Sequence, residues 1–308
     1  MSRRWWAPWL WLSPSLLLVG VFLVYPCLDT LRRSLMDARS QHFVGLDNYR
    51  YIIDNPAPLA SDTHTALLNN LLWLFLFTGI TVPLGLVIAT LTGRVRYEAL
   101  AKSAIFIPMA ISFVAASVIW RFMYELNPEV GTVNAVVTNL GGTPTAWLQD
   151  TRAPQAWLTS AGPDRIAGPL QINNLALIAV GVWMWTGFAV VVLSAGLKGI
   201  SSEVIEAARV DGAGDWQIFW RIIIPILSPT LVVVATTLVI QALKKFDLVW
   251  VMTGGRFDTD VVATLFFKEA FVNQNFGVGA ALAVVLLLWV APIMVISVRR
   301  FQFQEEMR

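Results

Sequence analysis

Residues 198 to 229 read KGISSEVIEAARVDGAGDWQIFWRIIIPILSP and combine two patterns in one stretch. The first part alternates charged and apolar residues, which predicts a short helix that begins near Ser201 and ends at Gly212. A second amphipathic segment from Trp216 leads to Pro225 and then into a long apolar run. The stretch therefore predicts a compact, water-exposed elbow of two short helices, joined to an apolar helix and suited to docking into another protein.

The composition around this stretch indicates a membrane protein. Of the 308 residues, 56% are apolar and only 14% are charged, so lipid is the expected solvent. A spanning helix needs about 20 mostly apolar residues. The stretches that qualify cover approximately residues 9–28, 67–91, 104–122, 175–197, 222–243 and 278–298. We expect an all-α membrane protein, a single transmembrane domain over residues 1–308 with about six transmembrane helices.

The positions of Lys and Arg predict the side of the membrane on which each loop lies. Basic residues are densest in the two tails and in the loops after the second and fourth spans, among them Arg3, Arg4, Arg94, Arg96, Lys102, Arg299 and Arg300. Both termini and the loop 198–221 are therefore expected in the cytoplasm. The loop 123–174, rich in polar and turn residues, is expected outside it.

Several functional classes are excluded by what the sequence lacks. A single cysteine, Cys27, leaves no internal disulfide, and the two histidines have no cysteine nearby, so no metal site is predicted. The net charge of +2 is too small to indicate nucleic-acid binding. No GxxxxGK[ST] loop occurs, and the spans contain no catalytic constellation. We expect a non-catalytic chain that binds no cofactor of its own.

The elbow also carries an ordered motif. Glu-Ala-Ala, three residues, Gly, nine residues and Ile-x-x-Pro occur here as Glu206, Ala207, Ala208, Gly212, Ile222 and Pro225. This order resembles the inner-membrane permease motif of ATP-binding-cassette importers, with Ile224 where the family has leucine. Asp211, FVGLDNY (43–49) and VMTGGRFDTDVVATLFFKEAF (251–271) are similar to the carbohydrate-uptake branch, so the resemblance covers nearly the whole chain. It is closest to maltose-type and alpha-glucoside permeases in the first-subunit position.

The resemblance implies a type I importer permease fold in the bacterial inner membrane. It implies that the loop 201–216 is a coupling helix seated on a separate ATPase. The residues implied in coupling are Glu206, Ala207, Ala208, Asp211, Gly212 and Pro225. The implied partners are a second homologous permease, a cytoplasmic ATPase dimer that binds ATP and Mg²⁺, and an extracytoplasmic solute-binding protein that delivers an oligosaccharide or glucoside. The chain lacks room for the extra spans and large insertion of the enteric maltose subunit, which leaves the sugar open.

A sugar path needs hydrogen-bonding and aromatic side chains within apolar spans. The candidates are Gln241, Lys244, Lys245, Trp185 and Asn173. Alternatively, the two lysines reach to the membrane interface and the tryptophan packs between helices. Asn69 and Asn70 are expected to cap the second span. The competing functions are import of glycerol phosphate or another small polar solute, and secondary transport, which normally requires a buried acid or histidine.

Overall fold

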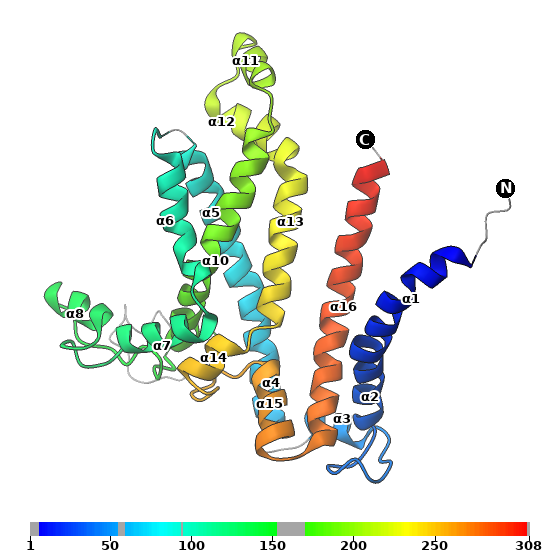
Figure 1. The fold of residues 1–308 in the computed structure, drawn as a ribbon. Coiled ribbons are helices and arrows are strands. Elements are labelled where there is room, and N and C mark those ends of the chain that lie inside the picture. The colour runs from blue at the N-terminus through cyan, green and yellow to red at the C-terminus, as the bar shows by residue number, and fades with distance from the viewer. Residues whose placement is uncertain (1–5, 55–58, 94, 153–169, 307–308) are drawn as a thin grey trace. The chain divides into compact units, whose positions relative to one another are not determined.

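A computed structural model describes residues 6–54, 59–93, 95–152 and 170–306, and the regular structure of this part is helical (Figure 1). The chain divides into two compact units. Unit 1 consists of Met1–Thr63 and Leu265–Leu288, and unit 2 of His64–Thr264 and Trp289–Arg308. The elbow and all the predicted site residues belong to unit 2.

Unit 1 begins with a long apolar helix. Helices α1 (Ala7–Val19) and α2 (Tyr25–Arg33) join through a π-helical turn, and Trp9–Arg33 forms 25 residues of apolar helix, enough to cross a bilayer. Asn48 of α3 (Asp47–Asp54) donates to the carbonyl oxygens of Ser34 and Met36 at 2.8 and 2.7 Å. The FVGLDNY stretch therefore fastens the end of the first span. Helix α16 (Phe276–Glu306) starts in this unit, and its apolar part covers Phe276–Pro292.

Unit 2 is a helical bundle that begins inside helix α4, at His64. Its helices are α4 (Leu59–Leu72), α5 (Thr78–Thr92), α6 (Glu98–Ala110), α7 (Phe113–Met123), α8 (Thr132–Asn139), α10 (Ile172–Lys198), α11 (Ser202–Val210), α12 (Asp215–Ile218), α13 (Ile224–Leu243), α14 (Asp247–Met252) and the start of α15 (Val262–Phe267). Three helical runs are long and apolar enough to span, namely Thr63–Thr92, Ile172–Lys198 and Asp215–Leu243.

Helix α10 is central in unit 2 and packs against α5, α6 and α13 (Figure 1). A Cβ added at Gly85 of α5 would lie 2.5 Å from the Cβ of Ala189. A Cβ added at Gly187 would lie 2.6 Å from the carbonyl oxygen of Ile105 in α6. Since both distances are too short for any side chain, glycine at these positions lets the helix backbones touch, as is common between helices in membranes.

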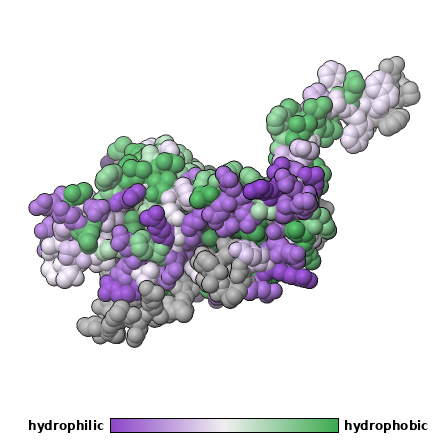
Figure 2. All heavy atoms as spheres, turned by 90° about the horizontal axis from the view of Figure 1, so that it is seen from below, coloured by the Kyte–Doolittle hydropathy of each residue, from purple (hydrophilic) through white to green (hydrophobic). Residues whose placement is uncertain are grey.

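The predicted third span, residues 104–122, is not a single straight helix, which corrects that expectation. Helices α6 and α7 meet at 96°, with extended backbone at Ile111 and Ser112 between them. Pro108 lacks an N–H, and α6 ends two residues after it. Helix α7 turns away from α6 and packs against α14, and hydrophilic residues gather on the face that these helices share with α8 (Figure 2).

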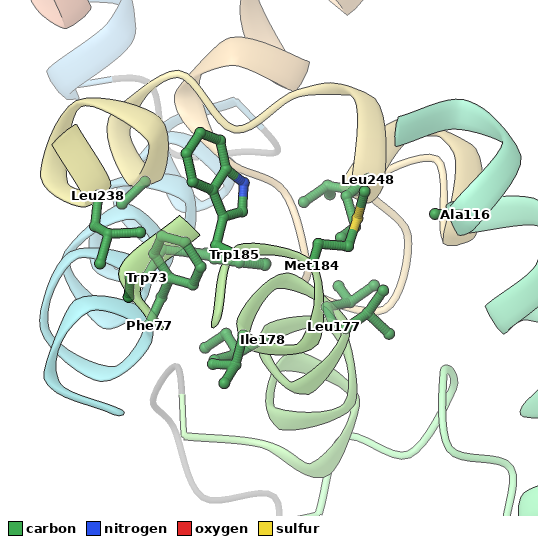
Figure 3. Close-up of a cluster of buried hydrophobic side chains, with 14 of the residues drawn as sticks. Trp73, Phe77, Ala116, Leu177, Ile178, Met184, Trp185, Leu238 and Leu248 are labelled. Atoms are coloured by element: carbon green, nitrogen blue, oxygen red, sulfur yellow. The ribbon is translucent and has the colours of Figure 1, made fainter. Parts of the chain in front are cut away.

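The apolar core of unit 2 lies around α10. Trp73 and Phe77 come from the π-helical turn Trp73–Phe77, Trp185 from α10 and Leu238 from α13, and all four are nearly or fully buried (Figure 3). Large side chains from two other segments thus pack against α10 here. This core lies between the elbow and the opposite end of the bundle, where α14 begins.

Candidate functional site

The elbow, residues 198–221, is built as the sequence predicts. Ser201 precedes α11, and its hydroxyl oxygen accepts a hydrogen bond from the backbone N–H of Glu203 at 3.2 Å. Such a cap satisfies one of the free N–H groups at a helix start, and the carboxylate of Glu203 lies at the positive end of the helix dipole. The first helix of the elbow therefore begins where local chemistry favours it.

The turn after α11 depends on Gly212. Its φ of +84° lies in the left-handed region, which only glycine adopts without strain. The N–H of Gly212 donates to the carbonyl of Arg209 at 3.0 Å, and the N–H of Ala213 donates to that of Ala208 at 2.9 Å. These two bonds form a Schellman motif, which closes a helix end. The turn is consequently a defined structure rather than a loose connection.

The elbow exposes a surface that mixes charge with apolar area. Glu206, Ala207 and Asp211 are exposed. Val210 is 88% exposed and Trp216 is 74% exposed, although both are large and apolar. Because aromatic and aliphatic side chains beside a few charges are typical of interface patches, this surface fits contact with another protein.

The second half of the elbow continues without a break into the fifth span. Helix α12 passes through the π-helical turn Phe219–Ile223 into α13, so that Asp215–Leu243 is one helix of 29 residues. Pro225 lies at the start of α13, where its missing N–H coincides with the π-helical turn. A displacement of the elbow would therefore move the whole of α13.

The far end of α13 leads to a buried lysine. Lys245 is 5% exposed, whereas its neighbour Lys244 is exposed and Gln241 is half-buried. The ammonium nitrogen of Lys245 lies over three aromatic rings. The distances to the ring centroids are 5.0 Å for Phe77, 5.3 Å for Trp73 and 5.6 Å for Phe113. We call Lys245 with these three rings the lysine cage.

The cage contains an excess of hydrogen-bond donors. In the part of the chain that the structure describes, Lys245 forms no ion pair, and the Nε1 groups of Trp73 and Trp185 are buried without a hydrogen-bond acceptor. Trp185 stacks on Phe113 with ring centroids 6.2 Å apart. A buried charge or donor is costly unless it is paired. Donors beside ring faces suit a solute that carries several oxygen acceptors, and the predicted residues Lys245 and Trp185 both lie here.

The prediction that Asn69 and Asn70 cap the second span is wrong. The helix starts at Leu59, and both asparagines lie inside α4 with no exposure. The amide of Asn69 donates to the carbonyls of Asp258 and Asp260 at 2.7 and 2.8 Å. Its oxygen accepts from Asn174 at 3.0 Å. These side chains therefore hold a distant loop instead of a helix end.

Asn173, predicted along the solute path, belongs to the same cluster. Its amide donates to the carbonyl of Phe257 at 2.6 Å, and its oxygen accepts from the backbone of Asn174 at 2.7 Å. We call Asn69, Asn70, Asn173 and Asn174 the asparagine clamp, since they fasten the loop 253–262 to α4 and α10. The sequence carries a signal for it, because two Asn-Asn pairs beside apolar runs require buried partners.

Across the described residues, no group of three or more His, Cys, Asp or Glu side chains is placed to hold a metal ion. That the chain binds no cofactor stays a prediction. Of the residues that carry the cytoplasmic charge signal, Arg3, Arg4 and Arg94 lie outside the described part, as do residues 153–169 of the predicted outer loop.

A family model and several known proteins match the sequence over most of its length. The model for the family "Binding-protein-dependent transport system inner membrane component" matches residues 81–304. The chain is 49% identical over 303 residues, 97% of its length and 100% of the relative, to the osmoprotective compounds uptake permease protein GgtC of Synechocystis sp.. It is 42% identical over 297 residues, 95% of its length and 81% of the relative, to the alpha-glucoside transport system permease protein AglF of Rhizobium meliloti.

The fold has a solved counterpart as well. A chain from a bacterial ABC transporter involved in the import of the acidic polysaccharide alginate aligns with a TM-score of 0.75 and 21% sequence identity. The alignment covers 96% of each chain. At this level of identity the match shows a shared fold, the type I importer permease fold that the sequence predicts.

Proposed function

The chain belongs to the family of binding-protein-dependent transport system inner membrane components, and we propose that it forms half of the pore through which such a transporter imports a glucoside. It is a non-catalytic permease subunit of an ATP-binding-cassette importer in the inner membrane, working with an ATPase and a solute-binding protein. A second homologous permease completes the pore, and both termini lie in the cytoplasm in this proposal.

Coupling to the ATPase is assigned to the elbow. The observation that supports it most is the continuous helix Asp215–Leu243, which joins the exposed elbow surface to the lysine cage. Ala207 and Ala208 allow close approach of a partner, and Glu206 offers it an acceptor. Asp211 and Gly212 form the turn, and Pro225 starts the span. Movement of the ATPase would thereby reach the solute path through one rigid element.

The substrate class proposed is a small alpha-glucoside. The relatives named above are permeases for osmoprotective compounds and for alpha-glucosides, which supports this choice. Lys245 of the lysine cage and Trp185, which stacks on Phe113 beside it, offer donors for the hydroxyl oxygens of the glucoside. Gln241 and Lys244 extend the path from the end of α13, and Asn173 supports its mouth.

The ammonium group of Lys245 supports a second candidate substrate. In the described part of the chain Lys245 forms no ion pair, although the carboxylate of Asp247 is near enough to interact with it electrostatically, so an anionic solute such as glycerol phosphate is the alternative. The two cargoes predict different competitors. Uptake of a labelled alpha-glucoside would be inhibited by maltose or trehalose in one case, whereas labelled glycerol 3-phosphate would itself be imported in the other.

The test is reconstitution of the whole transporter. The chain is assembled in proteoliposomes with its second permease, an ATPase and a solute-binding protein from the same genome. ATP-dependent uptake of maltose, trehalose or sucrose that requires all four components is expected. Uptake that proceeds without the ATPase, driven by an ion gradient, would establish a secondary transporter and refute the proposal.

A further inference from the structure

Unit 2 contains a cavity lined by both charged and apolar side chains at the end opposite the elbow. The cavity measures about 340 Å³ and lies where α7 ends and α14 meets the loop after it. Arg121, Glu125 and Gln149 line one side, and Arg256 and Phe257 line the other. The function proposed above uses none of these residues. Helix α10 separates this end of the unit from the elbow (Figure 1).

The first wall of the cavity is fixed by a buried asparagine. Asn134 of α8 is fully buried, and its amide donates to the carbonyls of Glu125 and Thr145 at 2.8 and 3.0 Å. Its oxygen accepts from the indole of Trp147 at 3.0 Å. The two segments that carry Glu125 and Gln149 are therefore held together by one side chain, as expected for a preformed cavity.

The second wall is fixed by the asparagine clamp. Asn173 holds the carbonyl of Phe257, and Asn69 holds that of Asp258. Phe257 and Asp258 both have a φ of 58°, which costs a non-glycine residue about 1–3 kcal/mol. Thr259 also donates to the carbonyl of Arg256 at 2.7 Å. Strain maintained by several buried bonds is typical of functional segments, so the loop is held in this shape rather than left to relax.

The groups presented by these walls are suited to an acidic partner. Arg121, Arg256 and Glu125 are all exposed, and among the described residues none of them forms an ion pair. Two guanidinium groups against one carboxylate leave one positive charge. Phe257 is 44% exposed at the rim. Arginine and aromatic side chains around a concave centre form the usual energetic focus of a protein interface.

We infer that this cavity is a docking socket that receives an acidic side chain from the solute-binding protein. The inference rests on the proposed function, which puts the elbow in the cytoplasm and hence the socket on the side from which the binding protein approaches. The charge of the socket selects a carboxylate, and its preformed walls remove the need for ordering on contact.

The test measures docking directly. The complete transporter is placed in lipid nanodiscs, and the affinity of its sugar-loaded binding protein is measured at low and high salt. Arg256→Gln and Arg121→Gln are each expected to weaken docking by about tenfold and to reduce its salt dependence. Glu125→Gln, which removes the opposing charge, is expected to strengthen it. Glu129→Gln, on an exposed residue outside the socket, is the matched control and should dock as wild type.

The outcomes separate the socket from the proposed function. If both arginine variants assemble and still bind the binding protein with wild-type affinity, the socket is refuted while the importer stands. The socket is also refuted if the arginine variants dock the binding protein as wild type does, while free maltose or glycerol 3-phosphate binds the wild-type cavity. If the wild-type transporter neither binds the binding protein nor imports sugar, the proposed function itself fails. Restoration of an Arg256→Glu variant by changing one acidic residue of the binding protein to arginine would identify the contact.

Discussion

Gly212 adopts a φ of +84° in the elbow, and a Cβ built there meets no atom within 4 Å. The cost of a side chain at this position is therefore purely one of backbone conformation. Gly212→Ala is expected to destabilise the turn by about 1–2 kcal/mol. ATPase activity stimulated by the binding protein, and uptake with it, should fall, while insertion into the membrane stays normal.

Asparagine provides the control for this change, because it tolerates the left-handed conformation better than alanine. Gly212→Asn should retain more transport than Gly212→Ala, as measured by sugar uptake per assembled complex. Equal uptake in wild type and both variants would contradict a coupling role for the turn.

Substitution of Lys245 should affect the stability of the protein and its transport activity differently. Lys245→Met keeps most of the side-chain volume and removes a buried charge that has no ion pair in the described residues. The melting temperature should stay unchanged or rise by about 2–4 °C, because a charge that has ring faces but no ion pair beside it no longer has to be buried. Sugar uptake should fall by about tenfold or more if the ammonium group donates to the solute.

Lys244→Met is the matched change on the exposed neighbour; it should leave the melting temperature unchanged and lower uptake less than Lys245→Met does. A large drop in melting temperature for Lys245→Met with normal uptake would show that the lysine cage is structural. The sequence alone left the two lysines equivalent, since adjacent residues at a helix end share every local property. Only the contacts of Lys245 with Phe77 and Phe113 distinguish them.

Among the elements, the elbow could be predicted from the sequence because its determinants are local. Ser201 caps α11 and Gly212 ends it, and both effects act within a few residues. The bend between α6 and α7 was not predicted, since a single proline near position 108 also occurs inside straight membrane helices. What decides the bend is packing: α6 lies against Gly187 of α10, while α7 packs on α14.

The asparagine clamp could not be predicted from local sequence either. Asn69 reaches the carbonyl of Asp260, which lies 191 positions away in the chain, and no local pattern identifies such a partner. In Asn69→Ala the carbonyls of Asp258 and Asp260 would lose their donor, at a cost of about 1–3 kcal/mol each if they stay buried. Hydrogen exchange should therefore accelerate in residues 253–262.

The elbow should keep its exchange rates in that variant, because it lies at the other end of α10. Asn139→Ala, on an exposed residue at the end of α8, is the control and should change neither region. Uniformly faster exchange throughout unit 2 would indicate general loss of folding instead of release of one loop.

At the scale of the whole molecule, the lengths of α10 and α13 set the distance between the elbow and the proposed solute path, over which a movement of the elbow must be transmitted. Helix α13 and its preceding turn place the elbow and the lysine cage at opposite ends of one helix. The family's dependence on a binding protein adds a third point, the socket beyond α14. In the proposed mechanism, the force on the elbow, the solute and the docked partner all act on unit 2, which is held together by the core around α10.

The orientation of this unit gives the last prediction. Helix α10 has 27 residues and is about 40 Å long, more than the hydrocarbon thickness of about 30 Å, so its ends must lie on opposite sides of the membrane. With the exposed Cys27 replaced by serine, Val210→Cys marks the elbow and Glu129→Cys marks the far end. A membrane-impermeant maleimide should label only Glu129→Cys in spheroplasts and only Val210→Cys in inverted vesicles. Labelling of Val210→Cys from the outside would place the elbow away from any cytoplasmic ATPase, and both the coupling role of the elbow and the docking role of the socket would then be refuted.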